Sequence, residues 1–122
     1  MVTLTPSATH VPLGRPVRLE VRVRNAGAHP VALEFGTACH TDYEVLSASG
    51  ELVGGSARMC AQMLSERSLA AGGAFADTLV WTPGARDAAP SAPGRYQLRG
   101  VLLRRGAEVR SAPVVVEVAG GN

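Results

Sequence analysis

Residues 17–25 read Val-Arg-Leu-Glu-Val-Arg-Val-Arg-Asn, and apolar and charged side chains alternate over the first eight positions, up to Arg24. Successive side chains of a β-strand point to opposite faces, so this stretch predicts a strand with one buried and one wet face. Asn25, Gly27 and Pro30 then supply turn residues, and the alternation resumes over residues 31–35. The two runs therefore predict neighbouring antiparallel strands.

Similar runs, bounded by Gly, Pro and Ser, recur along the rest of the chain. They predict strands over residues 2–5, 42–46, 51–53, 74–81, 95–103, 108–110 and 113–118. Residues 7–16 are expected to be a connector, and residues 82–94 to be the longest loop. Residues 58–67 are ambiguous because Met59, Met63 and Leu64 have helix-like spacing within a segment whose neighbours favour turns.

About eight short strands with frequent turns predict an all-β fold, an immunoglobulin-like antiparallel β-sandwich with at most one short helix. A β-barrel is the alternative. The 122 residues are enough for a single domain spanning 1–122, with residues 119–122 as a disordered tail.

Charge and hydropathy exclude two classes of partner. The basic residues are twelve arginines with no lysine, they stand against ten acidic residues, and only five residues are aromatic. Nucleic-acid binders concentrate basic side chains on one face, so we expect no nucleic-acid partner. No run approaches the roughly 18 apolar residues of a membrane-spanning helix, so we expect no membrane insertion. The first residues lack signal-peptide features, but a leader removed before Met1 would leave the same sequence.

Cys39 and Cys60 are the only cysteines. A disulfide between them would close a loop of about 20 residues and stabilise the fold by ~3 kcal/mol in the chain-entropy model. It would favour an oxidising compartment, periplasmic or extracellular, because stable disulfides are rare in the reducing cytosol. The alternative is two separate buried thiols in a cytoplasmic protein.

The residues that could carry chemistry do not form a catalytic or metal-binding pattern. Adjacent residues of an extended chain point apart, so Cys39 and His40 do not form an activated pair. Two cysteines and three scattered histidines lack the ligand spacing of a zinc site. We therefore expect no enzyme activity, no cofactor and no metal. Asp77 lies on the apolar parity of its run, which predicts either a β-bulge or a buried partner for an arginine.

Two loop regions are candidates for binding a partner protein. The first is the proline-rich loop of residues 83–93, with Pro83, Arg86, Asp87 and Pro90, because a restrained exposed loop loses little entropy on binding. The second combines residues 36–41 with residues 54–62, which the proposed disulfide would join. Its candidate contacts are His40, Gly54, Gly55, Arg58 and Gln62. Tyr96, which follows Gly94 at a strand start, fits a tyrosine corner, and Trp81 is expected to fill the core.

The order of these features resembles the intracellular proteinase inhibitor (BsuPI) family over nearly the whole chain. The similar segments are residues 17–25, 31–35, 41–45, 50–53, 69–73 and 94–96, together with Gln62 and Trp81. The chain departs from the family where Gly54-Gly55 and Cys60 stand in place of aromatic residues. The resemblance implies an immunoglobulin-like sandwich and a non-enzymatic inhibitor of a serine protease of the subtilisin type.

A second hypothesis is an immunoglobulin-like accessory or adhesion-type module of the cell envelope, which binds other proteins through a sheet edge and inhibits nothing. The sequence leaves the partner's identity and the oligomeric state open.

Overall fold

The computed structural model describes residues 1–56, 58–85, 90 and 92–120. The first sheet has the order β1-β3-β8, with β1 (Val2–Pro6), β3 (Val17–Arg24) and β8 (Ala74–Trp81). The second has the order β2-β11-β9-β5-β6, with β2 (His10–Pro12), β11 (Val114–Ala119), β9 (Gly94–Leu102), β5 (Thr41–Ser47) and β6 (Leu52–Gly55), and β10 (Val109–Arg110) also pairs with β9. A separate two-stranded ribbon joins β4 (Val31–Thr37) to β7 (Gln62–Leu69).

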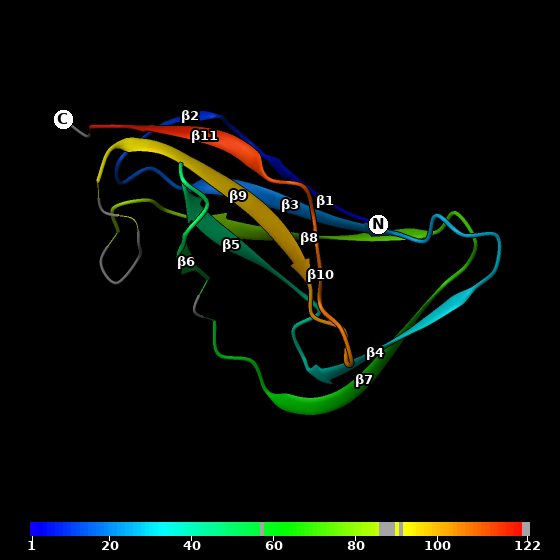
Figure 1. Ribbon diagram of the computed structural model, residues 1–122. Helices are drawn as coiled ribbons and strands as arrows, with labels where there is room; N and C mark the ends of the chain where they lie inside the picture. Colours follow the sequence, from blue (N-terminus) through cyan, green and yellow to red (C-terminus); the bar gives the residue numbers. More distant parts are fainter. Residues whose placement is uncertain (57, 86–89, 91, 121–122) are drawn as a thin grey trace.

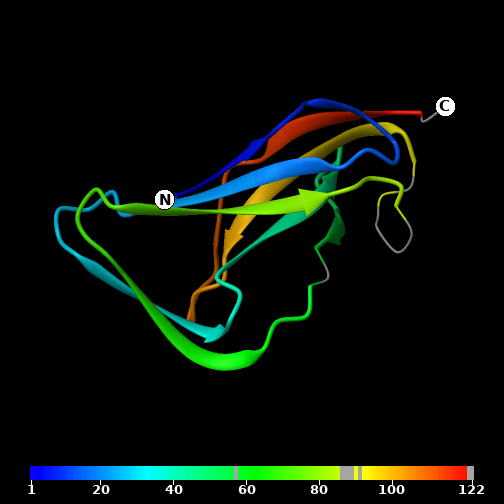
Figure 2. The same cartoon turned by 180° about the vertical axis from the view of Figure 1, so that it is seen from behind.

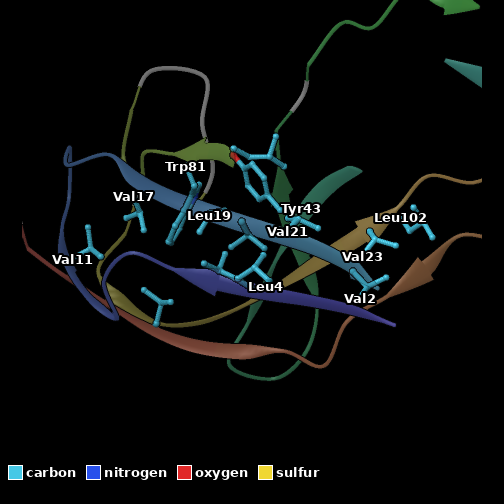
Figure 3. Close-up of a cluster of buried hydrophobic side chains, with 14 of the residues drawn as sticks. Val2, Leu4, Val11, Val17, Leu19, Val21, Val23, Tyr43, Trp81 and Leu102 are labelled. Carbon is cyan, nitrogen blue, oxygen red and sulfur yellow. The ribbon is translucent and has the colours of Figure 1, made fainter. Parts of the chain in front are cut away.

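The core lies between the two larger sheets, as the alternating pattern predicts (Figures 1 and 3). Every second residue of β3 is buried, beginning with Val17, and the residues between them are exposed. Trp81 is 1% exposed and fills the core as expected. At Gly100 a Cβ atom would lie 2.9 Å from Cγ1 of Val21, so this close approach of the two layers requires glycine. The fold is thus the predicted all-β sandwich.

The strands predicted at residues 17–25 and 31–35 are not neighbours, which corrects the expectation that they pair with each other. β3 pairs with β1 and β8, whereas β4 pairs with β7. The side chain of Asn25 explains the difference, because its Nδ2 donates to the carbonyls of Leu69 (3.2 Å) and Ala70 (3.2 Å) in the turn that leads to β8. The connection after β3 is thereby bound to the turn between β7 and β8 rather than closing a hairpin.

The β4–β7 ribbon therefore leaves the sandwich at the ends of β3 and β8 and runs back at an angle below it, as both views show (Figures 1 and 2). Its inner face is apolar, and Leu33, Phe35 and Leu69 are buried against the core. Its outer face, which includes Glu34 and Leu64, is exposed. The ribbon brings residues 62–65 next to the chain that enters β5.

Three other segments differ from expectation. Most of the ambiguous 58–67 segment is strand, because β7 takes its hydrogen bonds from β4, and the described residues contain no helix. The expected connector contains β2, which pairs in parallel with β11 through Val11 and Val118. Ala119, placed in the expected tail, ends β11 opposite Pro12, while residues 121–122 lie outside the described part of the chain. Within that part, nothing forms a helix long and apolar enough to cross a membrane.

Candidate functional site

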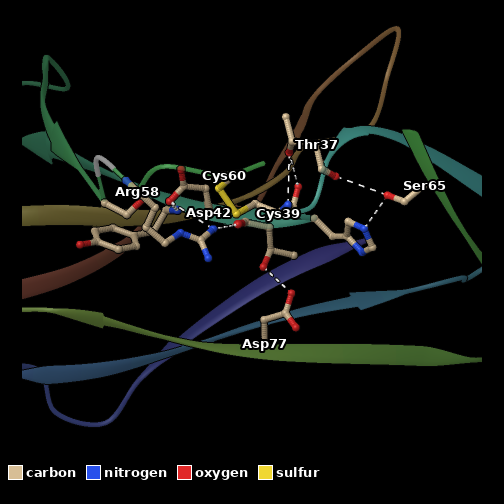
Figure 4. Close-up of a disulfide and its surroundings, with 11 residues drawn as sticks. Thr37, Cys39, Asp42, Arg58, Cys60, Ser65 and Asp77 are labelled. Atoms are coloured by element: carbon tan, nitrogen blue, oxygen red, sulfur yellow. Dashed lines mark hydrogen bonds and ion pairs between the residues drawn. A yellow bond between two sulfur atoms is a disulfide. The ribbon is translucent and has the colours of Figure 1, made fainter. Parts of the chain in front are cut away.

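A disulfide joins Cys39 to Cys60, with their Cα atoms 5.8 Å apart (Figure 4). It connects the link between β4 and β5 to the segment that precedes β7. Beside it, Ala38 N–H donates to the Ala61 carbonyl at 2.9 Å, and the Thr37 hydroxyl donates to the Cys39 carbonyl at 2.9 Å. The predicted pairing is confirmed, and with it the junction of the two segments of the second candidate surface.

The ring of His40 is held by a stacking contact and by a hydrogen bond. The imidazole stacks on Phe35 with a centroid separation of 3.8 Å and an interplanar angle of 13°. Its Nε2 lies 3.0 Å from Oγ of Ser65, and that hydroxyl also donates to the Thr37 carbonyl at 3.4 Å. Burial, followed by the nearby positive charge of Arg67, lowers the pKa of His40 below its ordinary value, while Asp77 opposes the shift. The shift favours the neutral form of the ring.

Ser65 is a residue that the sequence could not place beside His40. The two are 25 positions apart, and only the pairing of β4 with β7 brings them together. A serine hydroxyl next to an imidazole is the first half of a nucleophile and base arrangement. No carboxylate among the described residues hydrogen-bonds to the other ring nitrogen of His40. Cys39 has no thiolate to offer because its sulfur is bonded to Cys60.

The side chain of Arg58 is hydrogen-bonded to the start of β5, the strand that follows Cys39 in the chain. Its Nη2 donates to the Thr41 carbonyl, and the same atom lies 4.0 Å from Oδ1 of Asp42. Ion pairs this exposed contribute little stability, on the order of 0–1 kcal/mol. The two contacts direct the guanidinium of Arg58 toward β5.

Asp77 is not a bulge residue, and it forms no ion pair with any arginine in the described part of the chain, which corrects both predictions. β8 follows β3 without a register shift, and Asp77 stands opposite Val21. Its Oδ2 accepts a 2.6 Å hydrogen bond from the hydroxyl of buried Thr41. The neighbouring arginine, Arg67, instead places its guanidinium carbon 4.0 Å from the centroid of the Phe75 ring. The inward carboxylate is thus satisfied by a hydroxyl from the opposite sheet.

A polar cleft of about 340 Å³ lies beside the disulfide. Its lining includes Cys39, His40, Arg58, Arg67, Asp77 and Thr78. The described residues contain no group of three His, Cys, Asp or Glu side chains arranged to hold a metal ion. The arrangement offers hydrogen-bonding groups of both charges, which suits binding.

The residues of the predicted surface come from the disulfide region and from β6. His40 and Arg58 lie at the disulfide, and Gln62 begins β7 opposite Thr37. Gly54 and Gly55 lie on β6, the last strand of the second sheet, where a Cβ on Gly55 would come within 3.3 Å of the Tyr43 carbonyl.

Met59 lies between Arg58 and Cys60 in the chain, and its side chain is 100% exposed. In the sequence, Met59 stands out only as one position of a helix-like spacing. The signal that could have identified it is an apolar residue directly beside a cysteine in a segment with no strand pattern.

The long loop is fixed at its base. Pro83 and Pro90 are buried, and Gly84 N–H donates to the Pro90 carbonyl at 2.9 Å. The two prolines therefore anchor the loop and offer no surface to a partner, while Arg86 and Asp87 lie outside the described residues. The hydroxyl of Tyr96 donates to the Ala92 carbonyl at 2.8 Å, which confirms the predicted tyrosine corner.

The chain matches one family model and several solved structures. The family described as "Intracellular proteinase inhibitor" (BsuPI) matches residues 4–107. Among solved structures, a CARDB domain from Pyrococcus furiosus, in complex with di-metal ions, is 18% identical with a TM-score of 0.54 and covers 98% of this chain and 86% of its own. No protein of curated function matches the chain.

Two larger enzymes contain a similar domain. An alkylpurine DNA glycosylase from Pseudomonas fluorescens, bound to DNA with an abasic-site analogue, is 16% identical with a TM-score of 0.57 and matches 97% of this chain over 30% of its own. A β-glucosidase from Listeria innocua, in complex with glucose, is 15% identical with a TM-score of 0.51 and matches 99% of this chain over 16% of its own. Likeness at this identity shows the sandwich fold alone.

Proposed function

Because the chain belongs to the intracellular proteinase inhibitor (BsuPI) family, we propose that it inhibits a serine protease of the subtilisin type by binding it, without catalysing a reaction. The observation that carries this proposal is the covalent junction of residues 36–41 with residues 58–62 at the Cys39–Cys60 disulfide. An inhibitor needs a surface that enters a protease cleft without first being ordered, and this junction provides one on a packed sandwich.

The contact surface of the proposed inhibitor comprises His40, Arg58 and Gln62, with Gly54 and Gly55 at the neighbouring sheet edge. His40 is held by its stacking on Phe35, and Arg58 by the Thr41 carbonyl, so little rotamer freedom is left to lose on binding. Arg86 and Asp87 of the long loop form a second proposed contact, which replacing Arg86 with Ala would weaken.

A titration of the protein against a panel of serine proteases tests the function. We expect at least one subtilisin-type member to lose activity at micromolar or lower inhibitor, with no cleavage of the panel's substrates by the protein itself. No slowing of any protease at micromolar protein would refute the inhibitor and favour the accessory-module hypothesis.

The family description names an intracellular inhibitor, whereas a disulfide favours an oxidising compartment. We propose that this member acts outside the cytoplasm, where the bond persists. A thiol count on protein taken from its native source and unfolded without reductant is expected to find none. Two free thiols would place the working protein in a reducing compartment.

A further inference from the structure

The segment around Met59 is restrained on both sides while Met59 itself is free. Cys60, its next neighbour, is bonded to Cys39, and the Ala61 carbonyl accepts a 2.9 Å bond from Ala38 N–H. On the other side, Arg58 is held by its bond to the Thr41 carbonyl. Met59 is 100% exposed.

The backbone of Met59 is also unpaired within the described residues. Neither its N–H nor its carbonyl takes part in a hydrogen bond there, because the ladder between β4 and β7 begins only at Gln62. Another protein can bind a segment with free main-chain groups by adding hydrogen bonds to them, while side-chain pockets supply the specificity. Single exposed apolar residues are common, so the exposure gains meaning from this restraint and these free groups.

We propose that Met59 is the specificity-determining residue of the inhibitory surface, and that its side chain enters a deep, uncharged primary-specificity pocket of the target protease. This inference rests on the proposed function. Methionine is unbranched and apolar, so it fits a long apolar pocket and has no charge to offer a pocket with an acidic floor.

The neighbouring arginine is the alternative residue, and the structure disfavours it. The guanidinium of Arg58 is bonded to the Thr41 carbonyl and lies 4.0 Å from Asp42, so it is directed toward its own sheet. Entering an acidic pocket would require breaking those contacts. The geometry therefore selects a protease that accepts large apolar side chains over one that accepts Arg or Lys.

The test compares the wild type with Met59→Ala and Met59→Arg against two proteases, a subtilisin-type enzyme with an apolar pocket and a trypsin-type enzyme with an acidic one. Met59→Ala is expected to weaken inhibition of the first about 10- to 100-fold, since most of the apolar side chain is removed from the pocket. Met59→Arg is expected to lose inhibition of the subtilisin-type enzyme and to gain inhibition of the trypsin-type enzyme.

Val115→Ala is the matched control, because Val115 is another exposed apolar side chain, 49% accessible, on β11 far from the ribbon (Figure 1). It should inhibit as the wild type does, and all variants should unfold at the wild-type urea midpoint. Wild-type inhibition with Met59→Ala within twofold of it would overturn this inference and leave the proposed function standing. A wild type that inhibits no protease would overturn both.

Discussion

Removing the Cys39–Cys60 bond tests how the candidate site is held together. The two cysteines are 21 residues apart in sequence. In the chain-entropy model, a bond closing a loop of that length restricts the unfolded chain by about 3 kcal/mol at 25 °C. The double variant Cys39→Ala/Cys60→Ala, or the reduced wild type, should therefore lose about 3 kcal/mol of unfolding free energy.

Urea unfolding followed by tryptophan fluorescence measures this loss. Trp81 is the sole tryptophan and is 1% exposed, so its emission reports on the core. With an m-value on the order of 1.5–2 kcal/mol/M, the midpoint should fall by about 1.5–2 M. For 122 residues, at about 2.1 cal/mol/K of unfolding entropy per residue, the melting temperature should fall by roughly 12 °C.

Reductant provides the internal control. It should lower the midpoint of the wild type to that of the double variant, and it should not change the double variant. A midpoint of the double variant within about 0.3 M of the oxidised wild type would refute the reasoning. With the same m-value, that difference corresponds to only about 0.5 kcal/mol, far below the ~3 kcal/mol that loop closure gives. Inhibition should also weaken in the reduced protein, because residues 58–61 lose their covalent attachment beside Met59.

Gly100→Ala should destabilise the fold by about 1–3 kcal/mol, because the new methyl group would lie 2.9 Å from fully buried Val21; adding Val21→Ala should recover part of the loss in urea unfolding. Asn25→Asp, which keeps the shape but removes the Nδ2 donors, should cost about 1–3 kcal/mol by the same measurement, and a wild-type midpoint would contradict the role of Asn25 as the link between the two turns. Burial, with a smaller contribution from Asp42, raises the pKa of Tyr43 to about 12, so the folded state holds a proton that the unfolded state releases near pH 10. Stability should consequently be full below pH 10 and fall as the pH rises toward 12; Tyr43→Phe should remove that part of the pH dependence, and an unchanged profile would refute it.

The candidate site was predictable in part. The pairing of Cys39 with Cys60 was one of two readings that the sequence offered, the other being two separate thiols, and the tyrosine corner was predicted from Tyr96 at a strand start. The hydrogen bond of Thr41 to Asp77 joins two residues that are 36 positions apart in the sequence. The contact of His40 with Ser65 joins two that are 25 positions apart. They exist because strands from different parts of the chain are packed together, which no local pattern records.

The sequence by itself determined which side chains are buried, because alternation is a property of each strand alone and the apolar parity of residues 17–24 had to face a core. Only the tertiary structure decided which strand lies beside which. Every residue type except proline offers the same backbone donor and acceptor, and β3, β4 and β7 contain no proline, so β4 is equally able to pair with β3 or β7. The choice came from the side chain of Asn25, which binds the turn before β8, and from the burial of Leu33, Phe35 and Leu69 under the folded-back ribbon.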